Sequence, residues 1–203
     1  MGAELFLHLC ARNQYAVTIK DADIQQIVRQ VVDRVLAEKG QPVAAPVPTS
    51  VPAKTVALGG DHGGLAMKQD LAAYLAELGY AVNDCGTFTP DPVDYPDIAY
   101  AVAKLVSDGA AARGIIVDGA GIGSAMVANK VPGVRAALCY DLSTARNARE
   151  HNDANVLTLG ARLIGPGLAR DIVKAFLETQ CTEERHKKRV EKIMQVERRF
   201  LKK

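Results

Sequence analysis

From Thr55 onward, short apolar runs rich in β-branched residues alternate with stretches whose apolar positions recur at helical spacing. The short runs predict five strands, TVALG, YAVNDC, GIIVDG, VRAALC and NVLTLG. The intervening stretches predict helices: one that ends at Leu78, one over Tyr95–Ser107, and others that begin at Gly121, Asp141, Pro166 and Glu183. Strands that alternate with helices form parallel sheets covered on both faces. The pattern therefore predicts an α/β fold, a Rossmann-like three-layer α/β/α sandwich with a five-stranded parallel sheet.

The first 40 residues follow a different pattern, that of an amphipathic helix. Seven apolar residues form one stripe at helical spacing: Ile24, Ile27, Val28, Val31, Val32, Val35 and Leu36. The segment from Gly40 to Lys54 carries four of the nine prolines and predicts a semi-extended linker. We therefore expect an N-terminal extension at 1–40, a Pro/Ala-rich linker at 41–54 and an α/β domain at 55–203. The apolar stripe requires a partner, which is either the domain itself or another protein.

Composition narrows the function classes. The net charge is +2, and no segment approaches the roughly 18 consecutive apolar residues of a membrane span, so neither a nucleic-acid nor a membrane partner is indicated. The N-terminus lacks the pattern of a secretory signal. The four cysteines are widely separated and have no metal-binding spacing. We expect a soluble protein of the cytoplasm.

A glycine-rich loop after the third predicted strand is the main candidate for chemistry. Asp118 ends the strand, and Gly119, Gly121 and Gly123 follow it at alternate positions before a helix begins. Glycines let backbone amides approach an anion closely, and a helix N-terminus adds partial positive charge. A carboxylate beside such amides suggests proton transfer. The alternative is that Asp118 only caps the helix and that the glycines only shape a turn.

Two glycine loops are expected to meet. GGDHGG follows the first strand and DGAGIG the third, and in open α/β sheets such loops converge where the strand order reverses. A dinucleotide-binding oxidoreductase is disfavoured, because its G-x-G-x-x-G follows the first strand, whereas here G-x-G-x-G follows the third and Ser124 stands in place of the last glycine. Asp141, at the spacing of a ribose ligand, is predicted to begin a helix instead.

Several segments carry a resemblance to a known family: GGDHGG at 59–64, DYPDIA at 94–99, GAGIGSAMVANKVPGVRAAL at 119–138, REHNDANVLTLGAR at 149–162 and RHKKRVEKI at 185–193. From about Thr55 to Phe200 the chain resembles the type B ribose-5-phosphate isomerases, a family shared with galactose-6-phosphate isomerase subunits. The resemblance implies an aldose–ketose isomerase of phosphorylated sugars that needs no metal and no cofactor. It also implies a homodimer or a dimer of dimers, with active sites completed by a neighbouring subunit.

The resemblance implies roles for individual residues. His151, beside Asn152, matches the ring-opening histidine, and an imidazole that titrates near neutrality can move a proton between a ring oxygen and a hydroxyl. The remaining matches are the substrate-holding Asp61 and His62, the cleft-lining Tyr95, and the phosphate-binding Arg162, Arg185 and Arg189, the last two reaching into the partner's site with His186 beside them. Each of these residues has an ordinary alternative role in a turn, a cap or packing. The segment 183–203, with nine Lys/Arg and four Glu, could also be a solvated helix face or a nucleic-acid patch.

The chain departs from the family pattern at the proposed base. Type B enzymes have a cysteine where this chain has Asp118, and commonly a hydroxyl residue where it has Ala120. An aspartate can do the same work, although the adjacent helix N-terminus favours an ionised, weaker base. We expect an enediolate route in which His151 opens the ring, Asp118 takes the proton, and the loop amides hold the oxyanion: Gly119, Ala120, Gly121, Ile122 and Gly123.

Other functions stay open at this point. The substrate could be galactose 6-phosphate or allose 6-phosphate instead of ribose 5-phosphate, since one subunit class of galactose-6-phosphate isomerase resembles this chain at Asp118. The missing cysteine could also mark a catalytically weak sugar-phosphate-binding or scaffolding relative.

The N-terminal extension has a resemblance of its own. An Ile/Val-rich amphipathic helix tied by a Pro/Ala linker to an enzyme resembles the encapsulation peptides that dock cargo enzymes inside bacterial microcompartments. Residues 18–39 are therefore expected to bind microcompartment shell proteins, which would place the enzyme inside such a compartment in the cytoplasm.

Overall fold

The computed structural model describes residues 54–201, so the expected N-terminal helix and nearly all of the linker lie outside the described residues. A single five-stranded parallel sheet forms the centre of the described part, with the strand order β2-β1-β3-β5-β4. The strands are β1 (Thr55–Gly60), β2 (Ala81–Asp84), β3 (Arg113–Asp118), β4 (Ala136–Leu138) and β5 (Val156–Gly160). The predicted parallel sheet is confirmed, and each strand agrees with one predicted apolar run, although β1 ends one residue later and β3 begins one residue earlier than predicted.

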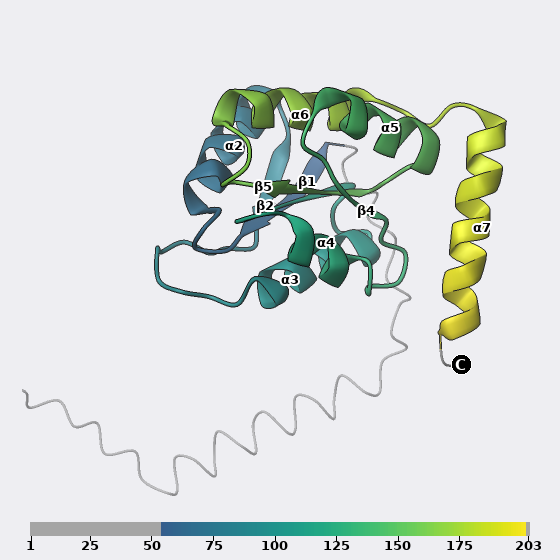
Figure 1. Ribbon diagram of the computed structural model, residues 1–203, viewed down its shortest axis with the longest axis horizontal. Helices are drawn as coiled ribbons and strands as arrows, with labels where there is room; N and C mark the ends of the chain where they lie inside the picture. The colour runs from purple at the N-terminus through teal and green to yellow at the C-terminus, as the bar shows by residue number, and fades with distance from the viewer. Residues whose placement is uncertain (1–53, 202–203) are drawn as a thin grey trace, which may run out of the picture. The chain divides into compact units, whose positions relative to one another are not determined.

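Helices cover both faces of this sheet (Figure 1). One layer consists of α2 (Leu65–Glu77), α5 (Leu142–Asn152) and α6 (Pro166–Glu178), and the other of α3 (Tyr95–Ser107) and α4 (Ile122–Ala128). Successive residues of a strand point to opposite faces, so Ile115 and Val117 enter the core under α2 and α6, whereas Ile116 enters the core under α3. Burial on both sides explains why the sequences of the inner strands β1, β3 and β5 are largely apolar. The predicted three-layer sandwich is confirmed.

The strand order reverses between β1 and β3, and the two glycine loops meet there as predicted. The amide of Asp61, after β1, donates to the carbonyl of Val117 at 3.1 Å. A Cβ on Gly64 would lie 2.2 Å from that same carbonyl oxygen, so only glycine permits the approach. The carboxyl ends of β1 and β3 therefore form one crevice.

A buried ion pair fixes the start of the loop from β2 to α3. The Lys68 side chain on α2 is 1% exposed, and its Nζ lies 2.6 Å from both carboxylate oxygens of Asp84. Asp84 also accepts a hydrogen bond from the amide of Gly86 at 2.9 Å. A buried ammonium group requires a partner of opposite charge. The pair thus directs the chain from the end of β2 towards the crevice.

The last helix, α7 (Glu184–Phe200), stands at the edge of the domain next to α5 (Figure 1). The Glu197 carboxylate accepts hydrogen bonds from the amide of Gly133 at 2.9 and 3.1 Å, and this contact joins the helix to the segment that precedes β4. Ile193, Val196 and Phe200 remain exposed on α7. Within residues 54–201, no helix is long and apolar enough to cross a membrane.

Candidate active site

The carboxylate of Asp118 is buried at the end of β3 and is surrounded by hydrogen-bond donors. Asp118 is only 5% exposed. Its Oδ1 accepts hydrogen bonds from the amide of Ala120 at 2.8 Å and from the amide of Gly121, and its Oδ2 accepts from the amide of Ser124 at 3.2 Å and from the Ser124 hydroxyl. This arrangement accommodates a negative charge. Two of the amides assigned to an oxyanion in the sequence analysis, those of Ala120 and Gly121, therefore face Asp118 itself.

The backbone of the loop is held in place from beneath. Gly121 has φ of +75°, and a Cβ at this position would lie 2.5 Å from Cδ1 of Leu138. The Thr158 hydroxyl on β5 donates to the carbonyl of Gly121 at 2.8 Å, and the Tyr140 hydroxyl donates to the carbonyl of Ala120 at 2.8 Å. The orientation of the Asp118 carboxylate therefore rests on a rigid support.

Four further residues from the sequence analysis lie at the same edge of the sheet. Asp61 accepts from the amide of Gly64 at 2.9 Å, and His62 is exposed, with Nδ1 accepting from the amide of Val93 at 3.3 Å. The Tyr95 ring covers Gly123, where a Cβ would come within 2.6 Å of it. The Arg162 side chain passes 3.7 Å from the position of a Gly119 Cβ. The Tyr95 phenol and the Arg162 guanidinium group thus lie against the Asp118 loop, and Asp61 and His62 belong to the neighbouring loop after β1.

His151 belongs to a second cluster, on α5 and α7. Its ring stacks on the ring of His186, with the centroids 4.2 Å apart and the planes 22° apart. The Asn147 side-chain nitrogen lies 2.9 Å from Nδ1 of His151 and so fixes the orientation of the ring. Asn152 follows His151 in the last turn of α5, and its side chain is exposed. The exposed side chains of Arg185 and Arg189 add positive charge to the same cluster.

The two clusters lie at opposite ends of the strands: Asp118 is at the carboxyl ends and His151 is near the amino ends. Asp118 pairs with Gly160, the last residue of β5, whereas His151 lies in the last turn of α5, just before β5 begins. Since β5 rises about 3.3 Å per residue, roughly 13 Å of strand separates the two levels. Arg135, at the start of β4, donates to the carbonyl of Asp153 at 2.7 Å and so fixes the end of α5 at the far edge. One chain does not bring Asp118 and His151 together.

Two cysteines of the described residues, Cys85 and Cys139, have thiols that ionise poorly. Burial raises the pKa of the Cys139 thiol to about 11. Burial also raises the pKa of Cys85, with a further contribution from the nearby Asp84 carboxylate. A thiol with a raised pKa supplies little thiolate at neutral pH. Residues 54–201 also contain no group of three or more His, Cys, Asp or Glu side chains that could hold a metal ion.

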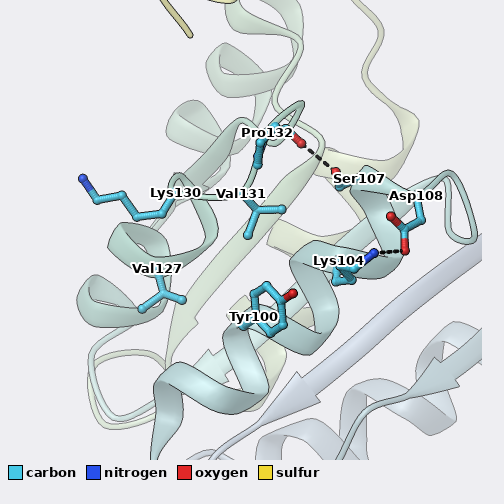
Figure 2. A pocket seen from close by; sticks show the side chains of 8 residues that line it. All are labelled: Tyr100, Lys104, Ser107, Asp108, Val127, Lys130, Val131 and Pro132. Atoms are coloured by element: carbon cyan, nitrogen blue, oxygen red, sulfur yellow. Dashed lines mark hydrogen bonds and ion pairs between the residues drawn. The ribbon is translucent and has the colours of Figure 1, made fainter. Parts of the chain in front are cut away.

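Two other features of the structure are separate from these clusters. A cavity of about 440 Å³ between α3 and α4 is lined by residues such as Tyr100, Lys104 and Val131, and it includes none of the predicted site residues (Figure 2). Asp141 caps α5, accepting a hydrogen bond from the amide of Thr144 at 2.7 Å, as the sequence analysis expected. Its carboxylate therefore has a local structural role and not that of a ribose ligand.

The structure adds two residues that sequence reasoning missed, Ser124 and Asn147. Asn147 stands four positions before His151, so both lie on one face of α5, and this spacing could have identified it. Ser124 stands six positions after Asp118, and no regular spacing connects a strand end with the first turn of the next helix. Only the turn of the loop brings its hydroxyl onto the carboxylate.

Comparisons with known proteins agree on one group of relatives. Residues 56–193 match the family model described as Ribose/Galactose Isomerase. Ribose-5-phosphate isomerase B of Escherichia coli is 42% identical over 146 residues, which cover 72% of this chain and 98% of the relative. D-erythrulose-4-phosphate isomerase of Pectobacterium atrosepticum is 41% identical over 143 residues, which cover 68% of this chain and 92% of the relative. The structure of Clostridium thermocellum ribose-5-phosphate isomerase B superposes with a TM-score of 0.71 at 45% identity and covers 72% of this chain and 99% of its own.

The histidine stack makes one pH-dependent prediction. Burial lowers the pKa of His186 below its usual 6.5, positive charge on His151, Arg185 and Arg189 lowers it further, and Glu150 opposes the effect. The unfolded chain therefore binds this proton more readily, so the contribution of His186 to stability is retained above about pH 6.5 and lost as the pH falls below it. An NMR titration of the His186 ring should give a midpoint below 6.5, and the midpoint should rise in His151→Ala. A midpoint at or above 6.5 in the wild type would contradict the packing of α7 on α5.

Proposed function

We propose that this chain, which belongs to the ribose/galactose isomerase family, interconverts the aldose and ketose forms of a phosphorylated sugar, with ribose 5-phosphate and ribulose 5-phosphate as the expected pair. The observation that carries the proposal is the buried Asp118 carboxylate at the crevice between β1 and β3, with Asp61, His62, Tyr95 and Arg162 around it. These groups can bind a polyhydroxylated anion and move a proton within it.

The chemistry runs through an enediolate. His151 opens the sugar ring by taking the proton of the anomeric hydroxyl and delivering it to the ring oxygen as the ring C–O bond breaks, which leaves the open-chain carbonyl. Asp118 then takes the proton from the carbon next to the carbonyl, the C–H electron pair becomes the C=C bond of the enediolate, and the carbonyl oxygen gains the negative charge. The amides that Asp118 does not occupy, those of Gly119, Ile122 and Gly123, are the donors proposed for that oxygen. Transfer of the hydroxyl proton from the oxygen on carbon 2 to the oxygen on carbon 1, together with return of the first proton from Asp118 to carbon 1, gives the ketose.

Two copies of the chain are needed for a complete site. Asp118 and Arg162 lie at one edge of the sheet and His151 at the other, so we propose a homodimer in which each site takes one cluster from each copy. Exposed apolar side chains support this arrangement. On α3 and α4 they are Tyr100, Ile122 and Met126, and on α7 they are Ile193, Val196 and Phe200. Covering Ile122 with α7 of a second copy would carry Arg185 and Arg189 towards the Asp118 loop, where they can bind the phosphate. A dimer of dimers remains compatible with this pairing.

The preferred sugar is the finer part of the proposal. The relative in Escherichia coli is named for ribose 5-phosphate and the one in Pectobacterium atrosepticum for D-erythrulose 4-phosphate. The relatives of this chain are therefore named for sugars with different numbers of carbon atoms. Galactose 6-phosphate and allose 6-phosphate are the alternatives. Ketose formation from each sugar phosphate, measured side by side, ranks them, and a chain that binds these sugars without converting any would be the scaffolding relative.

We also propose that residues 18–39 direct the enzyme into a bacterial microcompartment. Support comes from the Ile/Val stripe between Ile24 and Leu36 and from the proline-rich segment between Gly40 and Lys54, which separates that stripe from the α/β domain. The enzyme would then lie in the cytoplasm, within a protein shell.

Removal of the Asp118 carboxyl group should nearly abolish isomerisation. A general base contributes about 10² to 10⁴ in rate, so kcat of Asp118→Asn should fall by about that factor, whereas Asp118→Cys should retain activity. The measurement is the initial rate of ketose formation from ribose 5-phosphate, with circular dichroism as the control for folding. Asp118→Asn that isomerises as fast as the wild type would show that the base lies elsewhere.

Mixing two inactive variants tests the shared site. Asp118→Asn and His151→Ala should each be nearly inactive alone. After dissociation and reassembly together, half of the dimers are mixed and each mixed dimer has one intact site, so activity should return to about a quarter of the wild-type value. Wild type treated in the same way is the control for recovery. If both residues acted within one chain, mixing would restore nothing.

Deletion of residues 1–50 separates targeting from catalysis. The truncated enzyme should keep wild-type kcat and KM, because every residue assigned to the site lies after it. It should lose co-localisation with shell proteins, observed by fluorescence of a tagged enzyme in cells that express the shell. A truncated enzyme that still enters the shell would refute the targeting role of residues 18–39.

A further inference from the structure

We propose that Ser124 is the positioning residue of the Asp118 base, and that its hydroxyl frees Oδ2 for the substrate proton and then stabilises the protonated acid. This inference rests on the proposed function and concerns a side chain to which neither the sequence analysis nor the family resemblance assigned a role. Ser124 is fully buried, and its hydroxyl and its amide both donate to Oδ2 of Asp118.

Hydrogen-bond donors occupy both oxygens of the Asp118 carboxylate. An ionised carboxylate has about four acceptor positions on its two oxygens. In the structure these positions face four donors: the amides of Ala120 and Gly121 on Oδ1, and the amide and hydroxyl of Ser124 on Oδ2. A base with every lone pair engaged cannot take a proton from carbon unless one donor withdraws.

Of these four donors, the Ser124 hydroxyl can release the carboxylate most easily. The three amides belong to the loop backbone, which the Thr158 and Tyr140 hydroxyls hold by its carbonyls. The Ser124 hydroxyl is different, because rotation about its Cβ–Oγ bond moves the hydrogen without moving the chain. Turning that hydrogen aside leaves an open lone pair on Oδ2.

The Ser124 hydroxyl also suits Asp118 after the carboxylate has taken a proton. Once Oδ2 carries the substrate proton, its new O–H group needs an acceptor, and an amide N–H cannot accept a hydrogen bond. A hydroxyl oxygen accepts as well as donates, so Ser124 can receive a hydrogen bond from the protonated carboxyl group. The same side chain thus serves both protonation states of the base, and no backbone group in the loop can do so. The proton then returns from Oδ2 to the neighbouring carbon of the substrate.

The test combines steady-state kinetics with isotope effects. Ser124→Ala should lower kcat by about tenfold or more, the typical loss for a hydrogen bond to a charged group, with KM nearly unchanged. The kinetic isotope effect with ribose 5-phosphate deuterated at carbon 2 should increase, because proton transfer becomes more rate-limiting. Ser124→Cys keeps the volume with a weaker donor and should lie between Ser124→Ala and wild type. Ser107→Ala on α3, which removes a hydroxyl bonded to the Pro132 carbonyl, is the matched control and should behave as wild type.

A double variant separates positioning from a structural role. In the Asp118→Asn background, Ser124→Ala should cause no further loss of kcat, because the two side chains act as one unit. An isotope effect and kcat in Ser124→Ala equal to those of the wild type would overturn the proposal, and so would full additivity of the two substitutions. A wild-type chain that isomerises no sugar phosphate would instead overturn the proposed function, and the role of Ser124 with it.

Discussion

In a parallel sheet, every helix that connects two strands must bring the chain back to the end of the sheet where the strands begin. The positions of the two clusters depend on this constraint. β3 therefore delivers Asp118 to one edge, and α5 delivers His151 to the other. No side-chain rearrangement can close a gap set by the length of β5. The separation of these two side chains within one chain is the reason for our proposal that two copies share each site.

The Asp118 loop combines two demands that usually conflict. Burial of a carboxylate is costly unless donors surround it, but donors that satisfy it completely also reduce its tendency to take a proton. Here three backbone amides meet the first demand, and a rotatable hydroxyl on Ser124 addresses the second. An aspartate at this position thus fits the local structure, since a neutral thiol would not need so many donors. The Cys139 thiol, with its pKa raised to about 11, offers no substitute.

Charge is distributed between the two clusters in a way that suits a phosphorylated substrate. Arg162 lies beside the Asp118 loop, and Arg185 and Arg189 lie on α7 with the histidine pair. Burial lowers the pKa of His186, and the positive charges of His151, Arg185 and Arg189 lower it further, so a second positive charge between the stacked rings is disfavoured.

The fold class could be predicted from the sequence alone, and so could the glycine loop that follows β3. Apolar runs separated by helical periodicity were sufficient for the parallel sandwich, because burial on both faces leaves a direct mark on composition. The glycines around Asp118 likewise predicted the loop and the crevice with β1. Tertiary structure alone decided that Asp118 faces inward onto the amides of Ala120 and Gly121, that Ser124 completes its shell, and that His151 stacks on His186 at the opposite edge. Those facts depend on how the chain folds back through space, and linear spacing records periodicity within an element but not the contacts between elements.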